Sequence, residues 1–194
     1  MIIDQDIYDG ALIHKRFAYE YFRKDVSPVG NIVAFRAPME VKDNLIDLED
    51  TLTDDFISSK DAINFCWEIP NMCPLGAVAF QRLFNTAVAQ IISEYIKLPI
   101  SMKGDDLMVI DKFTGSDGEE RDEGKLSVSI TYSKENVTLG HTAINIDAGK
   151  DAPGFAYSSN LSDEDAEGFM IKVCNYFNYE IRDQFVATTK VIVK

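Results

Sequence analysis

The sequence has few cysteines and few basic side chains, and each shortage argues against a class of protein. The three cysteines, Cys66, Cys73 and Cys174, are an odd number at low density with no zinc-like spacing. We therefore expect reduced, mostly buried thiols and no disulfide scaffold. Lysine and arginine total 19 against 32 acidic residues, for a net charge of −13. Because nucleic acids and anionic membranes bind mainly lysine and arginine, neither is an expected partner.

Several functional motifs and targeting signals are also missing. The sequence contains no P-loop, no dinucleotide-binding glycine motif, no zinc-protease motif and no nucleophile elbow. The N-terminus is acidic and lacks the apolar run of a signal peptide, and no apolar run approaches the length of a membrane span. We therefore expect a cytoplasmic protein.

What remains is the composition of an ordinary folded protein. Hydrophobic residues make up 46% of the chain and charged residues 26%, values that are typical of globular domains. The 194 residues suit one domain better than two, so we predict a single domain over residues 1–194.

The hydrophobic pattern predicts alternating helices and strands, with residues 41–52 left open between a strand and a turn. The expected helices are 10–24, 58–67, 74–97 and the segment that follows an N-cap at Ser162. The expected strands are 31–36, 107–113, 125–132, 137–146 and 188–193. We expect Pro38 to end the first strand and Pro74 to begin the longest helix.

A polar, glycine-rich segment over 114–124 joins two of these strands and indicates an antiparallel hairpin with a long tip. A third strand, 137–146, should pair beside them. The order of elements does not alternate regularly between strand and helix. The predicted fold class is therefore α+β, with a mixed, mainly antiparallel sheet packed by helices.

Two turns bracket this hairpin and carry candidate site residues. Lys103, Gly104, Asp105 and Asp106 precede its first strand, and two adjacent acids beside a lysine could hold Mg²⁺ or position a substrate amine. Lys125 opens the second strand and could reach a phosphate or a carboxylate. For each residue taken alone, an ordinary solvated strand end is the commoner explanation.

His141 and Arg36 are candidates of a second kind. His141 lies within an apolar strand, where it could donate a hydrogen bond to a substrate or carry a proton near neutral pH. A histidine in a strand is more often structural. Arg36 lies at the end of a predicted strand and could project into a cleft and bind a carboxylate or phosphate. The alternative, an edge arginine paired with one of the many acids, is about as frequent.

Four segments in the middle of the chain match a known pattern in order, spacing and strand character. A helix over 75–97 leads to Lys103-Gly-Asp-Asp106, a turn leads to Gly124-Lys125-Leu-Ser-Val-Ser-Ile130, and a third strand ends in Thr142-Ala-Ile-Asn-Ile146. This arrangement resembles the biotin and lipoate protein ligase family. The chain is also similar to an uncharacterised, largely archaeal domain family of unknown function with a ligase-like fold.

The resemblance implies a class II aminoacyl-tRNA synthetase-like core that activates a carboxylic acid with ATP, usually with Mg²⁺. It implies that Lys125 contacts the acyl carboxylate and the α-phosphate, and that Lys103 and Asp106 line the pocket. Arg36 would be what remains of the family's arginine-rich nucleotide loop. Gly104, Asp105, Ser127, Ser129 and Asn145 stand in the matched segments and are expected to contact substrate or nucleotide.

The chain also departs from the family pattern. Trp-Pro-Asn of the family is replaced by Gly-Asp, the arginine-rich loop by Ala37-Pro38-Met39, and Gly-Ile after the lysine by Ser127-Val-Ser129. A normal biotin or lipoate ligase is therefore not expected, because fold alone does not carry the reaction.

Three functions stay open. The first is acyl-adenylate or acyl-transfer chemistry on a small carboxylate, with Lys125 and His141 in catalytic positions. The second is a non-catalytic module that binds a small ligand on the same fold. The third is a nucleotide-modifying or nucleobase-modifying enzyme that uses His141 and the paired acids Asp105 and Asp106. ATP and Mg²⁺ follow from the resemblance alone. A small-molecule ligand is expected in every case, and homo-oligomerisation is left open.

Overall fold

The computed structural model describes residues 1–53, 56–190 and 192. Its larger sheet has four strands in the order β1-β2-β7-β6. These strands are β1 (Asn31–Val41), β2 (Ile57–Pro70), β7 (Val137–Asp147) and β6 (Ser127–Lys134). Each neighbouring pair is antiparallel. The predicted fold class, an α+β fold built on antiparallel strands, is therefore confirmed.

A second, three-stranded sheet is built from β3 (Ile100–Lys103), β4 (Asp106–Thr114) and β5 (Glu120–Lys125). Strands β4 and β5 form a hairpin, in which Val109 lies opposite Gly124. The second strand of this hairpin was predicted over 125–132, but it lies over Glu120–Lys125, within the segment predicted as the tip. Only Leu126 separates β5 from β6, so one run of chain passes from the small sheet into the large one. Strand β6, which follows this crossing, pairs with β7 in the larger sheet.

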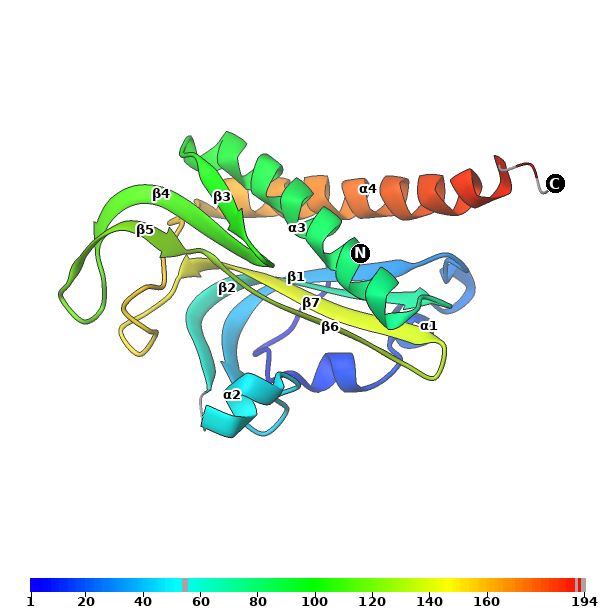
Figure 1. Ribbon diagram of the computed structural model, residues 1–194, viewed down its shortest axis with the longest axis horizontal. Coiled ribbons are helices and arrows are strands. Elements are labelled where there is room, and N and C mark those ends of the chain that lie inside the picture. The colour runs from blue at the N-terminus through cyan, green and yellow to red at the C-terminus, as the bar shows by residue number, and fades with distance from the viewer. Residues whose placement is uncertain (54–55, 191, 193–194) are drawn as a thin grey trace.

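Two long helices, α3 (Pro74–Ile96) and α4 (Asp163–Ala187), cover one face of the larger sheet (Figure 1). Both were predicted from their apolar spacing, and both are confirmed. Their N-caps are Cys73, whose sulfur accepts from the Gly76 backbone N–H, and Ser162. Helix α3 is long and apolar enough to cross a membrane, but half of the qualifying window is buried inside the protein.

The opposite face of the larger sheet is covered by the N-terminal segment and by α2 (Leu48–Thr53) (Figure 1). The N-terminal segment contains η1 (Ala11–His14), α1 (Ala18–Phe22) and η2 (Arg23–Asp25), which confirms the short helix expected over 10–24. Glu68 of β2 fixes this segment to the sheet. Its buried carboxylate accepts from the backbone N–H groups of Phe17, at 2.8 Å, and Ala18, at 2.9 Å.

The helix predicted over 58–67 is wrong, because these residues belong to β2. Strand β2 lies between β1 and β7 and is buried on both faces from Ala62 to Ile69. A strand buried on both faces has an unbroken apolar run, so its sequence lacks the alternation that distinguishes a strand from a helix.

Two smaller predictions are also corrected. Pro38 does not end β1, which continues to Val41 with a register shift between Ala37 and Met39. Because β1 is an edge strand, the missing N–H of a proline breaks no ladder bond there. The last strand expected over 188–193 is replaced, over its described part, by a short 3₁₀ helix, η3 (Thr188–Lys190). Residues 191 and 193 lie outside the described residues.

Candidate functional site

A cavity of about 560 Å³ lies mainly on the face of the larger sheet opposite α3. Its wall is formed by the N-terminal segment, residues 44–50, the ends of β1 and β2, β6 and the loop around Phe155. Ser127 and Ser129 line it from one side of β6, and Val128 and Ile130 from the other. The cavity therefore reaches around the free edge of this strand. Its volume suits a small-molecule ligand.

Lys125 lies at the base of this cavity, where the chain crosses between the two sheets. Its backbone N–H donates to the Phe155 carbonyl and its carbonyl accepts from the Tyr157 N–H, each at 2.8 Å. The Lys125 ammonium pairs with Asp106 at 2.9 Å. Among the described lining residues it is the one lysine or arginine. The acids in the lining are Asp47, Glu49, Asp50, Asp105 and Asp106.

The turn between β3 and β4 is held to helix α3 by a polar network. The Asp105 carboxylate accepts from Arg82 at 2.7 Å and from Gln81 at 3.1 Å, and its carbonyl accepts from Asn85 at 2.9 Å. Burial raises the pKa of Asp105, although the Arg82 guanidinium opposes this shift. Gly104 gives the turn its left-handed backbone, with φ of 67°. The network thus positions Asp106 beside Lys125.

Asp105 and Asp106, the two candidate Mg²⁺ ligands, are both engaged with protein side chains in this arrangement. The carboxylate oxygens of Asp105 contact Arg82 and Gln81, and Asp106 pairs with Lys125. No group of three or more histidine, cysteine or acidic side chains that could hold a metal ion occurs in the described parts of the chain. A magnesium ion prefers several free oxygen ligands, so we assign no chemical step to a bound metal here.

His141 lies on the cavity face of β7 and is only 2% exposed. Its Nε2 lies 2.9 Å from Oδ1 of Asn64. The ring of Tyr8 stacks on the imidazole with 3.9 Å between centroids. Burial lowers the pKa of His141 to about 3. The side chain is therefore neutral at pH 7 and is a poor carrier of protons near neutral pH.

The site residues predicted from the sequence fall into two groups, those that line this cavity and those that do not. Asp105, Asp106, Lys125, Ser127, Ser129, His141 and Asn145 all line this cavity. Arg36, Lys103 and Gly104 do not. Arg36 forms ion pairs with Asp61 and Asp163, each at 2.6 Å, and Lys103 pairs with Glu123.

The lining serines are engaged with the protein. The Ser127 hydroxyl accepts from the Leu107 N–H at 2.9 Å, and the Ser129 hydroxyl accepts from Gln81 at 2.9 Å. Asn145 is 5% exposed, and its amide donates to the Tyr157 carbonyl at 3.4 Å. These contacts fix the wall beside Lys125.

Sequence reasoning missed Tyr8 and Phe155 as lining residues. Tyr8 reaches the cavity because the N-terminal segment runs beside β1, where Tyr8 bridges to Met39. Phe155 reaches it because its carbonyl binds Lys125. Both contacts join residues about 30 positions apart in the chain, and neither residue is part of a recognisable motif.

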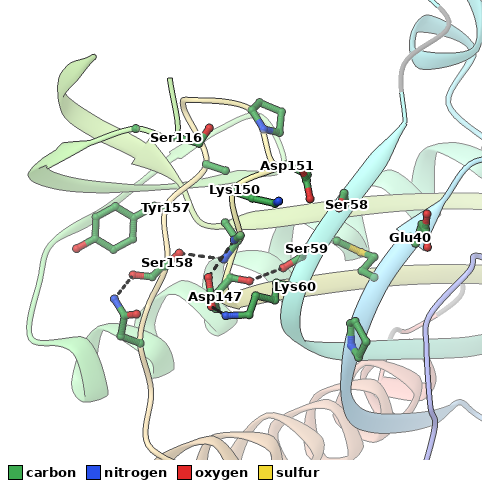
Figure 2. Close-up of a pocket in the computed structure, with 18 of the residues that line it drawn as sticks. Glu40, Ser58, Ser59, Lys60, Ser116, Asp147, Lys150, Asp151, Tyr157 and Ser158 are labelled. Carbon is green, nitrogen blue, oxygen red and sulfur yellow. Dashed lines mark hydrogen bonds and ion pairs between the residues drawn. The ribbon is translucent and has the colours of Figure 1, made fainter. Parts of the chain in front are cut away.

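A second, larger cavity of about 980 Å³ adjoins the first and shares Met39, Ser58, Pro153 and Ala156 with it. Figure 2 shows it between β2 and the loop that follows β7, with the ion pair of Lys60 and Asp147 at its floor. The Tyr157 hydroxyl donates to Asp111 at 2.7 Å. Burial and this hydrogen bond raise the pKa of Tyr157 to about 12.

The fold is that of the biotin and lipoate protein ligases. A biotin protein ligase from Aquifex aeolicus in complex with biotin and ATP superposes with a TM-score of 0.53 at 12% identity, covering 90% of this chain and 68% of the ligase. A bipartite lipoate protein ligase from Thermoplasma acidophilum gives 0.54 at 9% identity, covering 89% and 82%. At this identity the likeness shows the fold alone.

Within this fold the chain belongs to the family described as "Domain of unknown function (DUF366)", which matches residues 1–192. The structure of a protein of unknown function from Pyrococcus horikoshi superposes with a TM-score of 0.80 at 23% identity, over 100% of this chain and 97% of that one. No curated protein matches the chain. Both resemblances predicted from the sequence, to the ligase fold and to an uncharacterised family, are confirmed.

Proposed function

We propose that the smaller cavity binds a small carboxylic acid whose carboxylate is held by Lys125. The observation that carries this proposal is the position of Lys125, which is the one cationic side chain among the described lining residues and faces an otherwise acidic lining. A single anionic group of a ligand is stable only beside this ammonium. Lysine has three N–H donors, so it can bind Asp106 and a ligand oxygen together. The apolar side chains of the wall suit the rest of the acid.

We further propose that the bound acid is activated by ATP. Lys125 pairs through its backbone with the segment around Ala156, which lines both cavities. A ligand at Lys125 therefore lies close to the place where the cavities meet. A carboxylate oxygen would attack the α-phosphorus and form a P–O bond while the bond to pyrophosphate breaks, which gives an acyl-adenylate. An amine would then attack the acyl carbon, and AMP would leave. Lys125 would stabilise the negative charge that develops on the α-phosphate.

A binding assay on a single substitution tests the first proposal. Thermal shift and calorimetry with a panel of small acids should give at least one acid that stabilises the wild type. Lys125→Met should weaken the binding of that acid roughly ten- to a hundredfold, because a hydrogen bond to a charged group is worth about 1.5–3 kcal/mol. Lys134→Met is the matched control, because Lys134 is an exposed lysine at the far end of β6. Equal binding by wild type and Lys125→Met would contradict the proposal.

Release of pyrophosphate from ATP tests the activation step. With the acid identified above, the wild type should release pyrophosphate in an acid-dependent manner, and Lys125→Met should lose at least ninety per cent of this rate. Release that continues in Lys125→Met, or that does not need the acid, rules the step out.

The second candidate function is a binding module without turnover. The specific observation in its favour is the charge of the cavity, which has five acids and one lysine among its described lining residues. Such a lining repels a polyphosphate more strongly than it repels a single carboxylate. This candidate predicts acid binding that depends on Lys125, with no pyrophosphate release for any acid of the panel. In either case we propose a cytoplasmic, small-molecule-binding protein.

A further inference from the structure

His141 also lines the smaller cavity, and the proposed function does not use its imidazole. His141 lies opposite Ile130 in the pairing of β6 and β7. Ile130 is five residues beyond Lys125 on a nearly continuous strand, which corresponds to roughly 16 Å at 3.3 Å per residue. The two side chains therefore come from well-separated positions of the lining, and an elongated ligand could contact both.

The hydrogen bonds of Asn64 fix which nitrogen of His141 carries the proton. The Asn64 amide nitrogen donates to the carbonyls of Ala37, at 3.4 Å, and Ala62, at 3.2 Å. Two carbonyl acceptors require the NH₂ group on that side, so Oδ1 faces His141 and can only accept. Nε2 of His141 must then be the donor across the 2.9 Å contact. In a neutral imidazole this leaves Nδ1 as an unprotonated acceptor.

Nδ1 has no hydrogen-bond partner among the described residues, although the side chain is almost completely buried. It is also not sealed in the interior, since Trp67 Nε1 is the one fully enclosed and unpaired side-chain nitrogen or oxygen in the described structure. His141 lines the cavity, so Nδ1 is open to it. An acceptor that faces a cavity can receive a hydrogen bond from a donor that a ligand places there.

We propose that the ligand of this cavity donates an N–H or O–H hydrogen bond to Nδ1 of His141. Combined with the proposed role of Lys125, on which this part rests, the substrate class becomes a carboxylic acid with a hydrogen-bond donor on its apolar body. A ureido ring, an amide or a hydroxyl group would fit, whereas a plain fatty acid or a dithiolane ring would leave Nδ1 unpaired. The Tyr8 ring that covers the imidazole keeps the acceptor in place.

The tautomer can be measured without any ligand. The chain has two histidines, so a long-range ¹H–¹⁵N spectrum shows two imidazoles, and His14→Ala assigns them. At pH 7 we expect His141 to carry its proton on Nε2. Imidazolidin-2-one at millimolar concentration should move the Nδ1 resonance, and its N,N′-dimethyl derivative should not. A proton on Nδ1, or an equal effect of both ureas, overturns the proposal. Neither probe has a carboxylate, so this result is independent of Lys125.

Matched acids test the substrate class. Biotin carries ureido N–H groups on its ring and lipoate carries none, and ω-hydroxyoctanoate and ω-methoxyoctanoate form a second such pair. The acid with the donor should bind roughly three- to tenfold tighter than its partner, the value of a neutral hydrogen bond. His141→Phe should abolish this difference while Lys125→Met weakens all four acids. Discrimination below twofold in both pairs, or unchanged in His141→Phe, overturns the proposal. If none of the acids binds while the urea shift is seen, the carboxylate proposal fails and the donor site stands.

Discussion

The two faces of the larger sheet have different chemistry. Against α3 and α4, aromatic side chains from both layers are fully buried, and Trp67 and Phe84 lie 4.8 Å apart between ring centroids. On that side Gln81 and Asn85 have protein partners, whereas Nε1 of the enclosed Trp67 has none. On the other face, Nδ1 of His141 has no partner among the described residues, and the Lys125 side chain is about a third exposed. The helix face is thus a packed core, whereas the opposite face combines a second buried cluster with the cavity in which we propose that a ligand binds.

The largest expected effect tests the helix face. Phe84 has no exposed surface and packs against Phe65, Trp67 and Phe177. Phe84→Ala should lower the free energy of unfolding by about 3–5 kcal/mol, because it leaves a cavity in a packed core. Urea denaturation measures this, with Leu83→Ala, on the exposed side of the same helix, as the control. A loss below about 1 kcal/mol would remove the distinction between the faces.

The next effect concerns pH and the cavity face. The pKa of His141 is about 3 in the folded protein and about 6.5 in an unfolded chain. Because the pKa is lower in the folded protein, the neutral His141 contributes to stability in full above pH 6.5. This contribution is lost as the pH falls toward 3, at up to about 1.4 kcal/mol per pH unit.

Unfolding free energies at pH 7, 5.5 and 4.5 measure this loss. His141→Gln, which cannot become charged, should show a smaller slope than the wild type. Parallel curves for the wild type and His141→Gln would show that His141 does not titrate in this way.

A third prediction concerns the contact between the two faces. Gln81 belongs to the helix layer, but its amide donates to Asp105 and Ser129, which line the cavity. Gln81→Leu should destabilise the protein by about 1–3 kcal/mol, since it leaves buried polar groups unpaired. It should also weaken the binding of any acid that depends on Lys125, because the turn that carries Asp106 loses a hydrogen bond to α3. Gln90→Leu, the same change on the exposed side of α3, is the control. A stability loss without any effect on binding would show that the two faces act independently.

The smallest expected effect concerns Arg36, whose ion pairs with Asp61 and Asp163 are partly exposed. Arg36→Ala should change the free energy of unfolding by no more than about 1 kcal/mol. It should leave acid binding unchanged, because Arg36 is outside the cavity lining. Calorimetry with the acid identified for Lys125 checks this, and a tenfold loss of affinity would place Arg36 in the site.

Local patterns in the sequence were sufficient for the elements with a clear period or a capping residue. Helices α3 and α4 and strands β4 and β7 follow from apolar spacing, Pro74 and Ser162. A hairpin was expected after β4, but its second strand, β5, lies in the polar segment predicted as the tip. Strand β2 could not be recognised, because burial on both faces removes its alternation. The path of the chain after Lys125 was also missed, since pairing with β7 depends on contacts between distant segments.

The candidate site, like the fold, could be predicted from the sequence only in part. Asp106 and Lys125 could be placed together because the family pattern puts both at the base of one hairpin, and they pair in the structure. Arg36 was expected near them from its position at a strand end. The strand continues past it to Val41, so it projects elsewhere and pairs with acids. The acceptor at Nδ1 of His141 depends on Asn64, 77 positions away, and no local pattern contains that information.

The strand that passes from β5 into β6 also determines how a ligand can reach the cavity. Leu126, at the crossing, donates to the Leu107 carbonyl at 2.8 Å and accepts from the Asn145 N–H at 3.0 Å. The two sheets cannot swing apart without breaking these bonds. Segment 153–156 is likewise tied to Lys125 through the Phe155 carbonyl. Segment 44–50 lines the cavity and belongs to neither sheet, so its position, rather than any rearrangement of the sheets, would set the rates at which a ligand binds and leaves.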